Sequence, residues 1–302
     1  MSPGATSGQC QTPGMPTPGP VPEHPPWWRG PEPGRRLLGA RALVTGAGTD
    51  PTGGPVGIGE AIAVLFAAQG ARVAVVDIDA SRADATVRMI DACGGEGTAV
   101  VGDLADPDAN AQCVAEAAAA LGGLDTVVNS VAVTAGGGSP VDLDLDDWDR
   151  ALRINLGAAV LTARHAIPHL RDAGGGAILN VSSIAATRGH GSGAYAASKA
   201  ALGGLTRDWA YLHGREGIRV NEILIGHVFS PMGDQGGPEV RARRRRAGLL
   251  GTEGLAWDVA WPAVFLCSAE AGWITGVQLP VDAGTTATAP YAMQLLADRD
   301  PA

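Results

Sequence analysis

Short apolar runs alternate with longer segments of helical spacing along most of this chain, and that alternation limits its fold more than any other feature. The runs at 41–45 and 72–77 are almost wholly apolar, as expected for strands of a parallel sheet that is covered on both faces. Between them, residues 59–69 have the apolar spacing of a helix, and Gly70 marks its end. Strand, helix and strand in this order predict a βαβ unit with parallel strands.

The same unit repeats toward the carboxyl terminus. We expect further strands at 97–101, 126–129, 177–181, 218–225 and 277–281. The intervening helical segments are 81–92, 109–121, 147–169, 194–212 and 256–268, the third of them broken near Pro168. The sequence therefore predicts a single α/β domain of the Rossmann type, a doubly wound parallel sheet with helices on both faces.

Composition divides the chain into a folded body and two tails. Ten of its 21 prolines lie between Pro3 and Pro33, where aliphatic side chains are almost absent. Such a segment buries too little apolar surface to offset its ordering entropy, so we expect residues 1–34 to form a disordered tail. The folded domain is expected to cover 36–288, and residues 289–302 form a C-terminal tail.

Charge and hydropathy exclude several functional classes. A net charge of −9 argues against nucleic-acid binding, which requires a basic face. The basic run Arg241–Arg246 predicts mainly a solvated helix face, with an acidic partner as the alternative. The chain has no apolar run of about 18 residues, so no membrane association is expected. Its N-terminus lacks a secretory pattern, and we expect a cytoplasmic protein.

The histidines and cysteines do not form a metal motif. His165 and His169 are four residues apart, but Pro168 lies between them and no nearby carboxylate completes a ligand set. The cysteines have no metal-like spacing either. We therefore predict no metal site.

A glycine-rich turn connects the first expected strand to the first expected helix. Gly46 follows the strand, and Gly57, Ile58 and Gly59 open the helix. Glycines allow the backbone to turn sharply and approach a pyrophosphate, while the helix N-terminus offers free N–H groups and the positive end of its dipole. In this strand–turn–helix position, the turn predicts a dinucleotide site.

The end of the second expected strand indicates which dinucleotide binds. A carboxylate there, Asp77, can accept hydrogen bonds from the adenosine ribose and repel a 2′-phosphate. The next residue is Ile78 rather than Arg, and the turn from Gly46 to Gly59 contains neither Lys nor Arg. Asp77 and Ile78 are therefore candidate cofactor contacts, and they favour NAD over NADP.

Tyr195 and Lys199 are the strongest candidates for catalysis. They lie four residues apart on an expected helix and so share one face. A nearby ammonium favours the phenolate and lowers the pKa of the tyrosine, so that Tyr195 can exchange a proton with a substrate hydroxyl or carbonyl. Lys199 is also the only lysine of the chain.

In these residues the chain resembles the short-chain dehydrogenases/reductases, the family with a Tyr-x-x-x-Lys active site. The resemblance extends over nearly all of residues 40–286. Besides the glycine-rich turn, Asp77 and the Tyr195–Lys199 pair, the matching segments read GDL at 102–104, N at 129, RIN at 153–155, NVSSI at 180–184, RVN at 219–221 and LPVDAG at 279–284. Their order and spacing together make the resemblance specific.

The resemblance implies catalytic roles for four residues. Tyr195 would be the general acid or base, and Ser183 would hydrogen-bond the substrate oxygen. Lys199 would also bind the nicotinamide ribose. Asn155 would kink its helix and hold a water that connects Lys199 to solvent.

The resemblance also implies contacts to the cofactor. Asp103 and Leu104 would contact the adenine, and Asn129 would help to hold the cofactor side of the sheet. Val228 and Ser230 would bind the carboxamide.

The sequence departs from the family pattern at several points. Residues 49–56 push the glycines apart and form either a surface flap or a cover over the cofactor. The commonest spacing from Ser to Tyr in the family selects Ser182, whereas the local match to a strand followed by Ser-Ser-Ile-Ala selects Ser183, which we adopt. The usual Pro-Gly after the sixth strand is replaced by Ile-Gly, and the following His227 faces either the substrate or solvent.

The leading prediction is an NAD-dependent oxidoreductase that interconverts a small secondary alcohol and a ketone by hydride transfer, with Tyr195 as general acid/base. Two alternatives stay open. One is a cofactor-binding regulator or scaffold without redox turnover, and the other is a lyase or epimerase of the same family. The family also implies a homo-oligomer, either a tetramer or a dimer.

Overall fold

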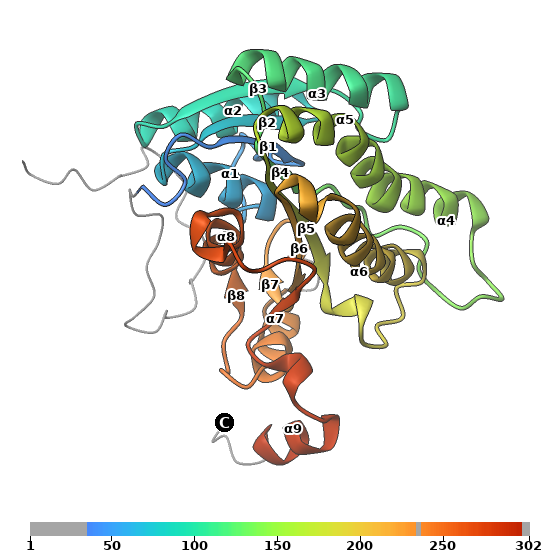
Figure 1. Cartoon of the computed structure of the whole chain (residues 1–302). Coiled ribbons are helices and arrows are strands. Elements are labelled where there is room, and N and C mark those ends of the chain that lie inside the picture. The colour runs from blue at the N-terminus through green and yellow to red at the C-terminus, as the bar shows by residue number, and fades with distance from the viewer. Residues whose placement is uncertain (1–34, 234–236, 298–302) are drawn as a thin grey trace, which may run out of the picture.

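The sheet at the centre of the molecule has seven strands in the order β3-β2-β1-β4-β5-β6-β9, and all neighbouring pairs are parallel (Figure 1). This computed structural model describes residues 35–233 and 237–297, so the predicted tail at 1–34 lies outside the described residues. The strands of the sheet are β1 (Arg41–Thr45), β2 (Arg72–Asp77), β3 (Glu96–Val101), β4 (Thr126–Asn129), β5 (Gly176–Ser183), β6 (Ile218–Ile225) and β9 (Gln278–Val281). The predicted doubly wound parallel sheet is confirmed.

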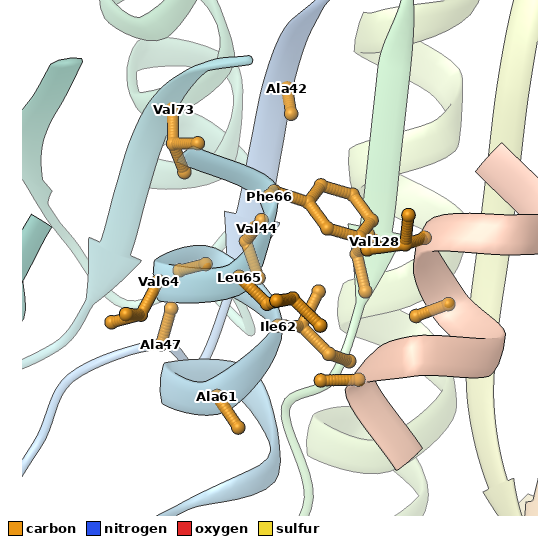
Figure 2. Close-up of a cluster of buried hydrophobic side chains, with 14 of the residues drawn as sticks. Ala42, Val44, Ala47, Ala61, Ile62, Val64, Leu65, Phe66, Val73 and Val128 are labelled. Carbon is orange, nitrogen blue, oxygen red and sulfur yellow. The ribbon is translucent and has the colours of Figure 1, made fainter. Parts of the chain in front are cut away.

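Helices cover both faces of this sheet, as predicted. One face carries α1 (Ile58–Ala68), α2 (Ala80–Ala92) and α8 (Ala256–Cys267). In the core of that face, Ile62 and Phe66 of α1 pack against Val44 and Val128 of the strands (Figure 2). The other face carries α3 (Pro107–Leu121), α5 (Ala158–Asp172) and α6 (Ala194–His213), with a separate apolar core.

Local capping explains why several helices begin one or two residues before the predicted positions. The carboxylate of Asp79 accepts hydrogen bonds from two backbone N–H groups of the first turn of α2. Asp106 does the same for α3, in which Pro107 occupies the first helical position, where the missing N–H costs nothing. Gly122 ends α3 with a φ of 72°, a backbone conformation that favours glycine.

The segment predicted as one helix over 147–169 is interrupted at a different place. A first helix, α4 (Leu145–Leu152), passes through a π-helical turn at Arg153–Gly157 into α5, which continues to Asp172. The predicted break near Pro168 is therefore wrong. Proline removes one helical hydrogen bond, but the neighbouring Ile167 and Leu170 are buried in the core and hold the helix in place.

Two smaller elements extend from the end of the sheet where the active site is expected. β7 (Val228–Phe229) and β8 (Gly254–Leu255) pair in parallel, and α7 (Gly237–Arg246) lies between them in sequence. Within the predicted C-terminal tail, residues Pro290–Ala297 form α9, which lies away from the sheet (Figure 1). Among the described residues, no helix has both the length and the apolar character required to cross a membrane.

Candidate active site

The predicted site residues gather at one edge of the sheet because parallel strands all end there. Each of the strands β1 to β6 contributes at its carboxyl end or in the loop that follows (Figure 1). In chain order, these residues are Gly46, Gly57, Ile58, Gly59, Asp77, Ile78, Asp103, Leu104, Asn129, Ser183, Val228 and Ser230.

The glycine-rich turn after β1 is folded too tightly for side chains. Gly46 has a φ of 60°, and a Cβ on Gly59 would overlap the carbonyl oxygen of Gly46. A Cβ on Gly48 would lie 2.7 Å from the carboxyl carbon of Asp77. These absent side chains leave a backbone cradle in front of the N-terminus of α1, which suits a pyrophosphate.

Asp77 connects the turn to the second βα unit. One carboxylate oxygen accepts a hydrogen bond from the backbone N–H of Gly48 at 2.9 Å, and the other accepts one from Asp79 at 3.1 Å. The side chain of the adjacent Ile78 is 68% exposed. Asp77 therefore shapes the turn in addition to presenting a carboxylate at the predicted ribose position.

Arg82 also lies close to Gly48 and Asp77, and the sequence analysis missed it. It lies in the first turn of α2, and its Cβ would be 2.6 Å from a Cβ built on Gly48. Its carbonyl accepts a hydrogen bond from the N–H of Thr49. Arg82 lies neither in the glycine-rich turn nor directly after Asp77, and the first turn of α2 brings it to the site.

The first of the inserted residues 49–56, Thr49, contacts a buried carboxylate, which the sequence analysis also missed. Glu60 is 3% exposed and accepts a hydrogen bond from the N–H of Gly57 at 2.9 Å. Burial raises the pKa of Glu60, and hydrogen bonds from Gly57 and from the side chain of Thr49 oppose that shift. Glu60 thereby fixes the beginning of α1, and Thr49 connects the insertion to it. A Glu in the first turn of the helix was the available signal.

The remaining positions on the cofactor side also fit a dinucleotide. The amide nitrogen of Asn129 donates to Asn180 at 2.9 Å, while its buried carbonyl oxygen has no partner in the described part of the chain. Leu104 is buried, and the exposed Asp103 forms a turn by accepting a hydrogen bond from Ala105. A bound dinucleotide would occupy the glycine cradle and would give the side-chain oxygen of Asn129 a partner.

Ser183, Tyr195 and Lys199 lie close together where β5 meets α6. The Nζ atom of Lys199 is 5.8 Å from the centre of the Tyr195 ring. The expected lowering of the Tyr195 pKa by Lys199 is not found, because burial raises this pKa and only a hydrogen bond with the Ser183 hydroxyl opposes the rise. The arrangement brings together the Tyr195 phenol, which can donate or accept a proton, the Ser183 hydroxyl and the positive charge of Lys199.

Lys199 is almost completely enclosed, with 2% of its surface exposed. Its ammonium donates a hydrogen bond to the carbonyl of Val181 at 2.8 Å. Burial lowers the pKa of Lys199 to about 8, and the negative charge of Glu222 opposes this shift. With a pKa of about 8, Lys199 can lose its proton at a pH much closer to neutrality than an exposed lysine can.

The two candidate serines occupy different environments. Ser182 is buried and donates to the backbone carbonyl of Lys199 at 3.1 Å. Ser183 is half-buried, interacts with Tyr195 and accepts a hydrogen bond from the N–H of Ala185. Of the two, Ser183 has its hydroxyl at the tyrosine.

Asn155 lies in the π-helical turn and reaches the catalytic helix through a residue that the sequence analysis missed. Its side chain exchanges hydrogen bonds with the backbone of Val133 and donates to the Ser198 hydroxyl at 3.2 Å. Ser198 in turn donates to the carbonyl of Tyr195 at 2.7 Å. A small cavity borders Asn155 and is also lined by Thr45, Leu104, Asn129 and Leu202.

The segment after β6 adds Val228 and Ser230, which are both buried, and the half-buried His227. Burial lowers the pKa of His227, and the positive charges of Arg244 and His190 lower it further. In the described part of the chain, no group of three His, Cys, Asp or Glu side chains converges as a metal site requires.

The arginine run Arg241–Arg246 is only partly a solvated face. Arg243 and Arg246 are exposed, but Nε of Arg241 donates to the carboxylate of Glu253 at 2.7 Å. The Arg241 guanidinium also lies 3.6 Å from the centre of the Phe229 ring. Because Glu253 is 2% exposed, this side of α7 is anchored rather than solvated.

Comparisons with known proteins agree with this geometry. A family model described as Enoyl-(Acyl carrier protein) reductase matches residues 54–286. The (3R)-3-hydroxyacyl-CoA dehydrogenase of Mus musculus is 36% identical over 258 residues, covering 82% of this chain and 97% of that protein.

Two of the similar solved structures contain nicotinamide cofactors. A 7α-hydroxysteroid dehydrogenase complexed with NADH and 7-oxo glycochenodeoxycholic acid is 33% identical, has a TM-score of 0.76, and covers 82% of this chain and 95% of its own. A short-chain dehydrogenase from Burkholderia cenocepacia J2315 in complex with NADP is 38% identical, has a TM-score of 0.75, and covers 83% of this chain and 100% of its own.

Proposed function

Because the chain belongs to the short-chain dehydrogenase/reductase family, we propose that it interconverts a secondary alcohol and a ketone by hydride transfer, with NAD as the preferred cofactor. One observation carries the proposal. The Ser183 hydroxyl, the Tyr195 phenol and the Lys199 ammonium meet at the carboxyl end of the sheet, beside a backbone cradle that only glycine can form.

The residues on the cofactor side would each hold one part of the dinucleotide. Gly46, Gly57, Ile58 and Gly59 would bind the pyrophosphate at the start of α1. Asp77 and Ile78 would contact the adenosine ribose, and Asp103 and Leu104 the adenine. Asn129 and Lys199 would hold the nicotinamide half, with Val228 and Ser230 on its carboxamide. When bound, the nicotinamide supplies the hydride acceptor or donor.

Tyr195 carries the proton in this proposal. During oxidation its phenolate oxygen takes the proton of the substrate hydroxyl, and during reduction it returns that proton to the carbonyl oxygen. Ser183 hydrogen-bonds the same substrate oxygen, since a hydroxyl can both donate and accept. Burial raises the pKa of Tyr195 and the hydrogen bond with Ser183 opposes that rise, and we propose that the Lys199 ammonium, 5.8 Å from the ring centre, stabilises the phenolate once it forms. Asn155 holds the helix that carries both residues, through Ser198.

The preference for NAD rests on Asp77. Its carboxylate would accept ribose hydroxyls and repel a 2′-phosphate, as the sequence predicts. Arg82 acts in the opposite direction because it places a positive charge at the same end of α2. We propose that Asp77 dominates, since its carboxylate is fixed by two backbone hydrogen bonds while Arg82 is exposed.

The test is a fluorescence titration with NADH and with NADPH on the wild type, Asp77→Asn and Asp77→Ala, using the tryptophans as energy-transfer donors. NADH should bind at least about tenfold more tightly than NADPH to the wild type, a difference of about 1.4 kcal/mol. Asp77→Asn keeps an oxygen that can accept from the Gly48 N–H but removes the charge and one of the two backbone hydrogen bonds, so it should lose the preference. Tighter binding of NADPH to the wild type would contradict the NAD assignment.

Turnover is measured in the same preparation with a panel of secondary alcohols and NAD, by the absorbance of NADH. Oxidation of any of these alcohols supports the proposal. Tight NADH binding without turnover on a broad panel would favour the regulator, and substrate conversion without net NADH would favour a lyase or epimerase.

The proposal also covers the organisation of the protein. Residues 36–288 would form one catalytic unit between the two tails, in a cytoplasmic homotetramer or dimer. Exposed apolar side chains on α5 and α6 support an interface between copies, namely Val160, Tyr211 and Leu212. Sedimentation equilibrium measures the mass, and a monomer at micromolar concentration would contradict the oligomer.

A further inference from the structure

A buried carboxylate on β6, Glu222, has no part in the mechanism above. None of its surface is exposed. In the sheet it lies between Asn180 of β5 and Gln278 of β9. A carboxylate at such a position is costly unless hydrogen bonds and an opposite charge compensate for its lost hydration.

The catalytic helix α6 packs against this carboxylate. Lys199, Gly203 and Arg207 follow one another at successive turns and share one helix face. A Cβ on Gly203 would lie 3.0 Å from an oxygen of Glu222 and would overlap the side-chain amide of Gln278. The glycine therefore makes room for the carboxylate one turn after the catalytic lysine.

Hydrogen bonds extend from Glu222 in both directions. The Gln278 amide donates to Oε2 of Glu222 at 2.7 Å, and its carbonyl accepts from the exposed Arg207 at 3.1 Å. On the side of the active site, the Ser182 hydroxyl interacts with Glu222 and also bonds the backbone of Lys199. Oε1 of Glu222 is buried and has no hydrogen-bond partner in the described part of the chain.

The charged groups that face Glu222 are therefore Lys199 and Arg207, both from α6, while β5 and β9 contribute the neutral Ser182 and Gln278. Burial raises the pKa of Glu222, and the hydrogen bonds and the charges of Lys199 and Arg207 oppose that shift. Burial lowers the pKa of Lys199, and Glu222 opposes it in turn. Each group thus stabilises the ionised form of the other.

We propose that Glu222 is a positioning residue for the reaction, whose buried carboxylate keeps Lys199 protonated, so that the proton released on activation leaves Tyr195 and not the lysine. Both groups can release a proton, and only the state with an ammonium and a phenolate accepts the substrate proton. Glu222 favours that state because its carboxylate packs against α6 one turn after Lys199 and its negative charge stabilises the ammonium. The inference rests on the roles proposed above for Tyr195 and Lys199.

The sole lysine allows a direct test on the full-length, cofactor-free protein. Lysine labelled with carbon-13 at Cε gives a single NMR signal, whose titration reports the pKa of Lys199. In Glu222→Gln this pKa should fall by at least about one unit, as expected for loss of a nearby opposite charge. Glu222→Asp should restore most of the difference. Glu216→Gln, which removes an exposed carboxylate paired with Arg171, is the matched control and should leave the signal unchanged.

A second readout is the pH profile of alcohol oxidation. Glu222→Gln should lower kcat across the profile while the KM for NAD stays near its wild-type value, because the fraction of lysine-protonated, tyrosine-deprotonated enzyme falls. Glu222→Asp should recover kcat. If Glu222 only supported the fold, Glu222→Gln would not lower the pKa of Lys199, and Glu222→Asp would not restore it.

Two results would overturn the inference. One is an unchanged Lys199 pKa in a Glu222→Gln protein that still melts cooperatively and binds NADH. If the Glu222→Gln protein does not fold, the test uses the Lys199 signal of the wild type. The Cε chemical shift of Lys199 must then show a second inflection at the pH where Glu222 titrates. A wild-type titration without this second inflection is the other result that would overturn the inference. The NMR result needs no turnover, so failure of the proposed reaction is distinguishable from failure of this inference.

Discussion

The proposed catalytic region at β5 and α6 differs in construction from the segment that runs from β7 to β8. Tyr195 and Lys199 stand on a helix of 20 residues, beside a strand of eight, and both elements are packed into the cores of the sheet. In the other segment, each strand has two residues, and α7 has no buried residue. Its anchor is the pair of Arg241 and Arg244 with the buried Glu253.

We propose that this difference separates chemistry from substrate binding, with the β7–β8 segment as the part that contacts the alcohol. The catalytic side chains are positioned by backbone hydrogen bonds and core packing, so that substitutions elsewhere on the surface should leave their geometry unchanged. The β7–β8 segment depends on a few ionic side-chain contacts, which one substitution can remove. We therefore expect effects on kcat from the first region and effects on KM from the second.

The largest effect is expected for Tyr195→Phe, which removes the proton carrier and little else. Its kcat should fall by about 10²–10⁴-fold, the usual contribution of general acid–base catalysis, while NADH binding persists. Tyr211→Phe alters an exposed tyrosine of the same helix and serves as the control. Steady-state kinetics with any alcohol turned over by the wild type measure the loss, and a Tyr195→Phe enzyme of nearly full activity would refute the assignment.

Lys199→Met should abolish activity and yet stabilise the fold. The pKa of the buried lysine is lowered to about 8, below the value near 10.4 of an unfolded chain. The folded state therefore bears the full cost of the ammonium below pH 8, up to roughly 3 kcal/mol, and this cost disappears as pH rises toward about 10.4. The lost hydrogen bond to Val181 and the lost compensation of the buried Glu222 charge reduce the gain.

Urea unfolding at neutral and at alkaline pH measures this effect. The stability advantage of Lys199→Met over the wild type should be greatest below pH 8 and shrink as the pH is raised. An advantage that stayed constant with pH would mean that packing, and not the buried charge, distinguishes the two proteins.

Glu253→Gln should act on the other region. Without the charge that holds Arg241 and Arg244, the segment loses its anchor, and the KM for the alcohol should rise by about tenfold, or about 1.4 kcal/mol. The value of kcat should change little. Glu239→Gln replaces an exposed acid of α7 and provides the control. A fall in kcat at unchanged KM would break the comparison between the two regions.

The smallest effect is expected for Arg243→Gln, because Arg243 is exposed on α7. Surface substitutions of this kind usually change free energies by less than about 0.5 kcal/mol, so KM should stay within about twofold of the wild type. An increase in KM confined to anionic substrates would instead support the acidic partner that the arginine run suggests.

The sequence alone determined the order of the seven strands of the main sheet and of the helices that cover it, and it predicted the candidate site residues. Both follow from local rules, since the apolar spacing of a segment selects strand or helix, and the glycines after β1 and the four-residue separation of Tyr195 and Lys199 are readable without distant contacts. The same local reasoning wrongly predicted a helix break near Pro168. Ile167 and Leu170 pack in the core and keep the helix continuous there. The helix is instead interrupted at the π-helical turn that contains Asn155.

Only the tertiary structure decided which distant residues meet. It placed Ser198 between Asn155 and Tyr195, Arg82 against Gly48, Glu253 under Arg241, and Glu222 beside Lys199. These contacts join residues on different elements, so they depend on strand register and helix packing. A one-residue change of register would turn Glu222 to the other face of the sheet, with the same sequence and the same secondary structure.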